Sequence, residues 1–162
     1  MNAELVNILN KYGTGIVSEI RQNLSSTGTD ATGKTSNSLR YEVINEGTKA
    51  TLKVLGKPYF MVVETGRKPT PSYKPSENFV DSIKEWMKAK GKQGSAYAIA
   101  LTIHKKGSTL WRDGGRKDIV SNVINQNLVD RISIDLLNKF AQQYMSNVVK
   151  IFTDGSKHTT TA

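Results

Sequence analysis

The sequence predicts an α+β fold: a small, mostly antiparallel sheet with N-terminal, central and long C-terminal helices. Two observations support this prediction. Apolar residues recur at helical spacing near both ends of the chain and in its middle, and two short runs between residues 38 and 55 alternate apolar and polar side chains. The 162 residues suit a single core, so we expect one domain over residues 1–152 and a flexible tail at 153–162.

The helices are predicted from apolar residues that are three and four positions apart. The central two begin at a serine, which can cap a helix, and end at a glycine, which can adopt the left-handed backbone of a helix end. Gly13 and Gly15 weaken the middle of the first helix and could kink it. The expected helices cover residues 2–24, 76–91, 95–107 and about 126–152.

Alternation with a period of two predicts a β-hairpin at residues 38–55, with its turn near Glu46. Tyr59 to Glu64 form a compact apolar run that fits a third strand or a short helix, and its β-branched and aromatic residues favour the strand. Residues 67–76 hold three prolines, which predicts an extended segment outside any central strand. The remaining stretches are loops at 25–36 and 109–115, and a segment at 116–125 that is ambiguous between strand and helix.

The composition predicts a soluble chain with a large surface. Hydrophobic residues make up 37% of it, so we expect part of that surface to be buried only against other copies or a partner. The chain has no cysteine, which excludes a disulfide framework, a thiolate zinc site and a cysteine nucleophile. Met1 to Asn10 lack the pattern of a signal peptide, and no apolar run approaches the ~20 residues that span a bilayer. We therefore expect folding in a reducing cytoplasm and no membrane partner.

The net charge of +9 is unevenly distributed. Residues 84–117, here called the basic segment, carry nine basic and two acidic side chains. This segment either faces phosphates or an acidic partner, or forms a solvated, lysine-rich face that favours solubility. The candidates for contact with DNA or an acidic partner are Lys105, Lys106, Arg112, Arg116 and Lys117.

Residues 28–35 match the phosphate-binding pattern G-x-x-x-x-G-K-[ST], with Lys34 at the phosphate-binding position. That site requires a buried parallel strand before the loop and a helix after it. Here an amphipathic helix precedes the loop and a strand-like alternation follows it. We therefore expect a flexible polar loop that leads into the hairpin, and a P-loop NTPase is the last of the alternatives.

Few residues are placed to carry out chemistry. Glu64 follows an apolar run, where a buried carboxylate paired with Arg67 or with backbone amides is commoner than a catalytic one. No second carboxylate stands at a recognisable spacing from Glu64. His104 lies far from the other histidine, His158, and is expected to be a surface or capping residue. We expect no catalytic residue, no cofactor and no metal, and thus no enzyme.

Several short motifs, in their order and spacing, resemble the head–tail joining proteins of tailed bacteriophages, also called tail-completion or neck proteins. Residues 32–39 are similar to the polar stretch that leads into the first hairpin of that family, which gives the glycines of the loop a structural explanation. The resemblance covers about residues 30–107; Thr65 departs from the aromatic or aliphatic residue that the family often has there. The other motifs are Tyr59 to Arg67, the proline-rich stretch, the helix with Trp86 that ends at Lys90 and Gly91, Ala96 to Ala100, and Ile103 to Gly107.

This resemblance implies a structural virion protein that forms a ring in the neck or tail and joins the DNA-filled head to the tail. Such a ring is a homo-oligomer with cyclic symmetry, assembled in the host cytoplasm. The implied partners are copies of the chain itself, portal or connector and tail proteins, and possible phage DNA in the lumen. The expected assembly interface comprises Glu64, Thr65, Gly66, Arg67, Lys68, Pro69, Pro71, Tyr73 and Trp111.

Two features of the sequence agree with docking. Prolines stiffen the loop at 67–76, so it loses less entropy when it binds a partner. The basic segment suits a lumen that DNA passes through or the acidic surface of a neighbouring ring. The alternative is a non-specific nucleic-acid-binding protein that uses residues 84–117, because no motif for reading bases is present in the sequence.

Overall fold

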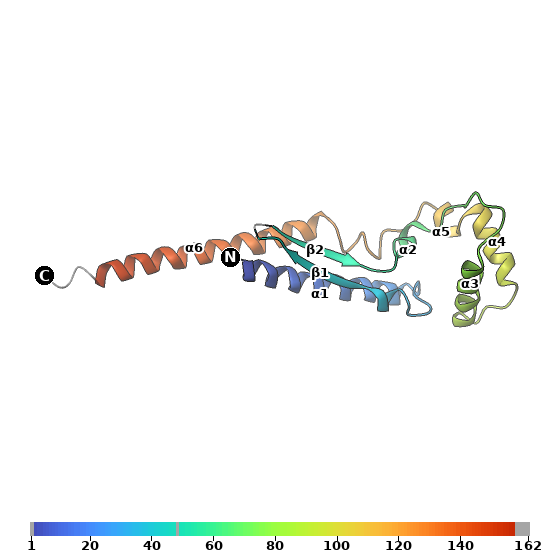
Figure 1. Cartoon of the computed structure of the whole chain (residues 1–162), viewed down its shortest axis with the longest axis horizontal. Coiled ribbons are helices and arrows are strands. Elements are labelled where there is room, and N and C mark those ends of the chain that lie inside the picture. Colours follow the sequence, from blue (N-terminus) through green and yellow to red (C-terminus); the bar gives the residue numbers. More distant parts are fainter. Residues whose placement is uncertain (1, 48, 158–162) are drawn as a thin grey trace.

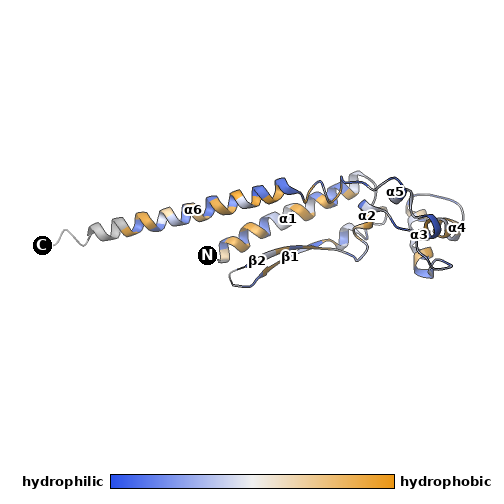
Figure 2. Cartoon of the chain, turned by 90° about the horizontal axis from the view of Figure 1, so that it is seen from above, coloured by the Kyte–Doolittle hydropathy of each residue, from blue (hydrophilic) through white to orange (hydrophobic). Residues whose placement is uncertain are grey.

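The computed structural model of the chain describes residues 2–47 and 49–157 and shows an elongated α+β molecule (Figure 1). The N-terminal helix lies between a two-stranded antiparallel hairpin and the long C-terminal helix, which confirms the predicted fold class (Figure 2). In chain order the elements are α1 (Asn2–Ser26), the 3-10 helix η1 (Ser36–Ser38), β1 (Arg40–Asn45), β2 (Ala50–Leu55), α2 (Val62–Thr65), α3 (Glu77–Ala89), α4 (Ala96–Lys106), α5 (Thr109–Arg112) and α6 (Gln126–Lys157).

The hydrophobic core lies where α1, the hairpin and the beginning of α6 meet. On β1 and β2, Tyr41 pairs with Val54, and the next pair on the same face is Val43 with Leu52. The buried residues of α1 recur every three to four positions, as one face of a helix requires. The core cluster consists of Ile16, Val17, Ile20, Leu24, Leu39, Phe60, Ile119, Val120, Val123 and Leu128.

Gly13 has a packing role in the middle of α1. A Cβ atom at this position would lie 2.4 Å from Cδ2 of Tyr41, so the missing side chain lets this ring of β1 lie against the helix. The hydroxyl of Thr14 also lies 3.1 Å from the hydroxyl of Tyr41. Gly13 and Gly15 do not interrupt α1, which runs from residue 2 to residue 26.

Of the two alternatives for Tyr59 to Glu64, the structure shows the short helix, α2, and not the third strand. The amide of Phe60 donates to the carbonyl of Lys57 at 2.8 Å, and the amide of Val62 donates to that of Tyr59 at 3.0 Å. These bonds between residues three apart coil the backbone instead of extending it. Within the described residues, the sheet therefore contains only the two strands of the hairpin.

Residues 109–115 were expected as a loop, but they contain α5. Ser108 begins this helix, because its hydroxyl accepts a hydrogen bond from the amide of Trp111 at 3.2 Å. A single turn is too short to show a helical period in the sequence. The ambiguous segment at 116–125 forms turns rather than a strand or a regular helix.

Helix α6 is longer than predicted. It also extends beyond α1, which packs against its first half. It continues to Lys157, five residues past the expected end, and the rest of the expected tail, 158–162, lies outside the described residues. Tyr12 donates to Asp135 at 2.8 Å and Lys139 pairs with Glu4 at 3.2 Å, which ties the first half of α6 to α1. Past Glu4, α6 projects beyond the beginning of α1 (Figures 1 and 2). Among the described helices, none is long and apolar enough to cross a membrane.

Candidate assembly interface

Glu64 on α2 is the buried polar centre of the region that the sequence marks as an interface. Only 3% of its surface is exposed. Its Oε1 accepts hydrogen bonds from the backbone amides of Ile119 at 3.0 Å, Val120 at 2.6 Å and Ser121 at 3.0 Å. Its Oε2 accepts from the hydroxyl of Ser121 at 2.6 Å. The carboxylate therefore holds the segment that leads into α6 against α2, in the amide-bonded form that the sequence suggested.

The ionised form of Glu64 is favoured by these bonds. Burial by itself would raise the pKa of Glu64, but the hydrogen bonds from Ser121, Val120 and Ile119 outweigh burial and hold the pKa below its ordinary value of 4.5. Asp30 shows the same balance, because hydrogen bonds from Ser36 and Thr35 lower its pKa against the effect of burial. Both carboxylates are therefore charged near neutral pH, where each satisfies several amide donors.

Gly66, directly after α2, allows a close backbone crossing with α5. Its φ is +70°, and a Cβ atom there would lie 2.3 Å from the amide nitrogen of Trp111. The neighbouring residue, Arg67, forms two bonds with Ser108: its amide donates to the hydroxyl at 2.9 Å and its carbonyl accepts from the Ser108 amide at 2.9 Å. Gly107 is equally confined, since a Cβ atom would meet the Trp111 ring at 2.6 Å. These contacts join α2, α5 and the end of α4 into one junction.

The proline-rich segment at residues 67–76, here called the strap, lies outside any strand as predicted, although it bends at residues 72–74, and it is hydrogen-bonded to α4. His104 fastens it: Nε2 donates to the carbonyl of Ser72 at 2.7 Å, and the carbonyl of His104 accepts from the amide of Thr70 at 2.8 Å. His104 is 2% exposed, so the expectation of a surface or capping histidine is wrong. The guanidinium of Arg67 lies 3.6 Å from the centre of the Phe79 ring, which fixes the strap to α3.

The residues expected at the interface fall into two groups in the structure. Glu64 and Gly66 are buried against other parts of the same chain, so they shape the junction and expose almost no surface of their own. Arg67, the first residue of the strap, is half-buried. The exposed group consists of Thr65, Lys68, Pro69, Pro71, Tyr73 and Trp111. Tyr73, in the middle of the strap, is 94% exposed, so a partner could cover it.

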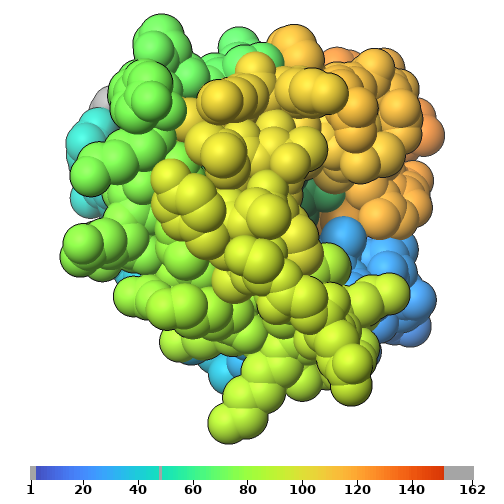
Figure 3. All heavy atoms as spheres, turned by 90° about the vertical axis from the view of Figure 1, so that its right-hand side faces the viewer, coloured from blue at the N-terminus to red at the C-terminus, as the bar shows by residue number. Residues whose placement is uncertain are grey.

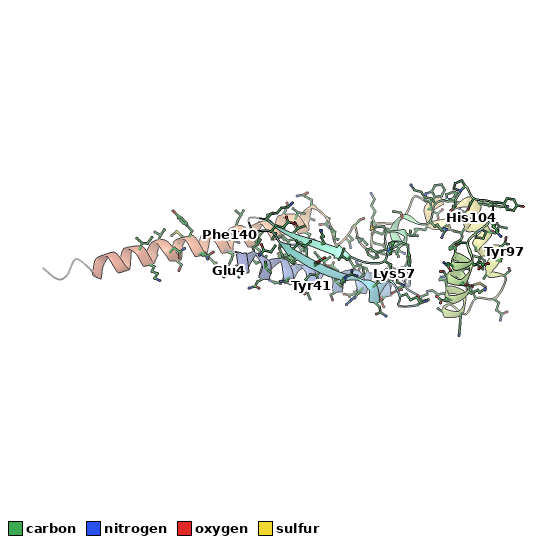
Figure 4. All side chains as sticks on the ribbon, viewed as in Figure 1. Glu4, Tyr41, Lys57, Tyr97, His104 and Phe140 are labelled. Atoms are coloured by element: carbon green, nitrogen blue, oxygen red, sulfur yellow. The ribbon has the colours of Figure 1, made fainter. Side chains whose placement is uncertain are left out.

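The basic segment lies at the end of the molecule that is farthest from the free part of α6, where α3 and α4 pack on each other (Figures 1 and 3). Figure 4 places His104 and Tyr97 at this end. Arg116 forms a two-pronged ion pair with Asp118, with both distances 2.6 Å. In the described part of the chain, the other expected contact residues are exposed and form no ion pair: Lys105, Lys106, Arg112 and Lys117.

The loop at residues 28–35 does not have the surroundings of a P-loop. It follows α1 rather than a strand, and it leads through η1 into β1. The carboxylate of Asp30 accepts from the amides of Thr35 at 3.2 Å and Ser36 at 2.8 Å, so these donors already have an anionic partner. Lys34 pairs with Glu85 of α3. The loop thus fastens α1 to α3, and Asp30 and Lys34 both have partners within the chain.

Comparison of the chain with protein-family models, with curated proteins and with solved structures gave no match. The functional assignment therefore depends on the geometry described above and on the resemblance of the short motifs.

Replacement of Glu64 tests the carboxylate at the junction. Glu64→Gln keeps the size of the side chain but removes the charge, so we expect the free energy of unfolding to fall by about 1.5–3 kcal/mol near pH 7, as measured by urea denaturation. Because folding lowers the pKa of Glu64, its charged form stabilises the fold above the ordinary pKa of 4.5, and this contribution is lost as the pH falls below it. The difference between wild type and variant should thus shrink below about pH 4.5.

Glu46→Gln, on the exposed hairpin turn, is the matched control and should change stability by less than about 0.5 kcal/mol. A Glu64→Gln chain as stable as this control at pH 7 would contradict the role of the carboxylate.

Gly66→Ala tests the backbone crossing. The new methyl group would overlap the amide of Trp111, and the positive φ adds strain, so we expect a loss of about 2–4 kcal/mol in the free energy of unfolding, followed by tryptophan fluorescence. Gly91→Ala is the control: its φ is +60°, but no atom lies within 4 Å of the added Cβ. It should show only the backbone strain of about 1–2 kcal/mol. Equal losses in the two variants would show that the crossing is not confined.

Proposed function

We propose that this chain is a structural subunit of a tailed-phage virion, which assembles into a ring in the neck or tail and joins the DNA-filled head to the tail. The observation that carries the proposal is the separation of two different surfaces at opposite ends of an elongated chain. One end carries the basic segment and the strap, and the other end carries a projecting helix with exposed apolar side chains. A connecting subunit needs such separated surfaces, because it must bind different neighbours at the same time.

The end with the strap is built to dock without much rearrangement. The prolines limit the conformations of the strap before binding, and the bonds from His104 and Arg67 hold it in place. The exposed side chains of the strap, such as Tyr73, are therefore attached to a backbone that is already held in place before binding. This arrangement agrees with the resemblance of residues 30–107 to head–tail joining proteins.

The test of this proposal is assembly with virion proteins. The purified chain, mixed with the portal and tail proteins of the same phage, should form rings visible by electron microscopy and should be present in finished particles. Tyr73→Ser should reduce incorporation by about fivefold or more if Tyr73 anchors the docked strap, because truncation of an anchoring interface aromatic costs more than about 1 kcal/mol. Asn45→Ser, an exposed substitution on β1, should leave incorporation unchanged. Persistent monomers that never enter particles would refute the proposal.

A second candidate function, non-specific nucleic-acid binding, is favoured by the exposed cations of the basic segment. Lys105, Lys106 and Lys117 lie exposed without ion pairs to described residues, as phosphate contacts require. Within the segment the only carboxylates are Glu85, which pairs with Lys34, and Asp113; just outside it, Asp81 pairs with Lys84 and Asp118 with Arg116. The excess of positive charge at this end therefore remains available to an anionic partner.

Salt dependence tests this second function. If the basic segment binds DNA, affinity should fall steeply with salt, and replacement of Lys105, Lys106 and Lys117 by Gln should reduce the slope of log K against log salt by about 2–3. The control, Lys49→Gln with Lys53→Gln, removes charge from the exposed hairpin and should change the slope little. A wild-type chain that does not bind DNA at low salt excludes this function.

A further inference from the structure

The outer edge of β1, the side away from β2, has backbone groups without a partner. The amide of Glu46 donates to the carbonyl of Lys49 at 2.8 Å, so these two facing residues form a hydrogen-bonded pair of the hairpin. Because bonded and non-bonded pairs alternate along an antiparallel ladder, Tyr41 and Val43 belong to non-bonded pairs. Their amides and carbonyls therefore point away from β2, and no hydrogen bond joins them to another described residue.

The side chain of Arg21, on α1, lies at this outer edge. Leu39 comes just before β1, and its carbonyl points to the same side as that of Tyr41, two residues further on. Nη2 of Arg21 donates to the carbonyl of Leu39 at 2.7 Å, and Nε donates to the carbonyl of Ser36 at 3.1 Å. The edge is therefore occupied at Leu39 and becomes free from Tyr41 onwards.

A groove of about 490 Å³ lies along this edge, between β1 and α1. Its wall is the beginning of β1, with Arg40 and Tyr41, and no residue of β2 lines it. Its floor is α1, where the short side chains of Thr14, Val17 and Ser18 leave room above the helix. A third strand beside β1 would therefore lie over α1, and every second side chain of that strand would point into the groove.

The position of α1 limits what kind of strand fits there. α1 covers one face of the hairpin, contacts more of β1 than of β2, and forms the floor beyond the edge of β1. A second copy that paired its own β1 antiparallel to this one would bring its α1 to the same face. The two helices would then be separated by little more than the spacing of neighbouring strands, about 5 Å, whereas packed helices need about 8–10 Å. The occupant is therefore an extended segment that has no helix on this face.

The charges beside the groove favour an acidic occupant. Arg40 is exposed and forms no hydrogen bond or ion pair with a described residue, and Nη1 of Arg21 has no partner among them either. The described residues that line the groove include no carboxylate. Glu42, two residues beyond Arg40, faces Lys53 across the hairpin. A carboxylate on the added strand would therefore meet two cations whose charge nothing in the groove neutralises.

We infer that the outer edge of β1 is a docking site for an extended acidic segment of another protein, which adds a third strand to the hairpin. The backbone of this segment bonds to Tyr41 and Val43, its apolar side chains enter the groove over α1, and a carboxylate pairs with Arg40 and Arg21. The inference does not depend on the proposed function, because it uses only the free edge, the groove and the charges beside it.

Two synthetic peptides test the charge of the occupant: fluorescein-labelled peptides in which valine alternates with glutamate or with lysine. Wild type should bind the glutamate peptide at least about tenfold more tightly than the lysine peptide in fluorescence anisotropy at about 0.15 M salt. Arg40→Glu should weaken binding of the glutamate peptide by about tenfold or more, because a hydrogen bond between charged groups is lost. Arg40 is exposed, so the variant should unfold at the wild-type temperature. Lys49→Glu makes the same change of charge at the exposed turn and should bind within about twofold of wild type.

Amide hydrogen exchange, followed by NMR, tests the place and the mode of binding. With the glutamate peptide at about ten times its Kd, the amides of Tyr41 and Val43 should exchange about tenfold more slowly, because the added strand accepts hydrogen bonds from them. The amides of Leu52 and Val54 point outward from the opposite edge, on β2, and should not change. A peptide with proline in place of its central valine lacks one amide donor, so it should bind more weakly and give less protection.

Four results would overturn the inference. The first is a wild-type chain that does not bind the glutamate peptide at about 1 mM, and the second is protection confined to Leu52 and Val54. The third is an Arg40→Glu chain that binds this peptide as well as wild type, since the peptide would then be held by other cations. The fourth is protection of Tyr41 and Val43 when the chain alone is concentrated, which would make a second copy the occupant. None of these results bears on entry into virions, so the neck function is tested separately.

Discussion

The hydrogen bonds of Glu64 are the interaction on which the rest of the structure depends. One carboxylate collects the amides of three successive residues, 119–121, and thereby fixes where the chain returns to the core after the central helices. Ile119 and Val120 are core residues, and they are in place because their amides are bound to Glu64. The beginning of α6, including Leu128, follows directly from that segment. A buried charge with four donors thus serves as the link between the two halves of the core.

The same junction fixes both ends of the segment that carries the central helices. The chain leaves at Gly66 and returns at Gly115, where a Cβ atom would lie 2.8 Å from the carbonyl oxygen of Glu64. The amide of Arg116 donates to that same carbonyl at 2.8 Å. Both ends of the segment from Gly66 to Gly115 are therefore fixed at Glu64. Because of this, α3, α4 and α5 can carry a high positive charge without disturbing the core. Lys90 and Lys34 add two ties between α3 and the loop that follows α1.

Local patterns account for the parts of the fold that the sequence predicted well. The helices at α1, α3, α4 and α6 have a period that is visible within a few turns, and the hairpin has its alternation. The choice between strand and short helix at residues 59–64 could not be made from residue preferences, because turn hydrogen bonds between neighbours decide the conformation there. The partners of Glu64 were out of reach, since they lie 55 to 57 residues away and donate through backbone amides, which every residue except proline has. Likewise, nothing local shows that His104 would be covered by the strap.

For the candidate site, too, some features could be predicted from the sequence and others depend on tertiary contacts. Proline content and charge located the strap and the basic segment, because both are properties of composition. Which members are exposed depends on tertiary contacts: Glu64 and Gly66 became internal supports, whereas Tyr73 stayed on the surface. The apolar residues of α6 recur at helical spacing in the sequence, but the exposure of Leu137, Tyr144 and Ile151 could not be predicted, because an apolar helix face usually indicates the core of the same chain. In this fold α1 covers one side of the first half of α6, and apolar side chains such as Leu137 stay exposed on another side. A helix with two apolar sides, one of them buried within the chain, has the form expected of a subunit that completes its burial only on assembly.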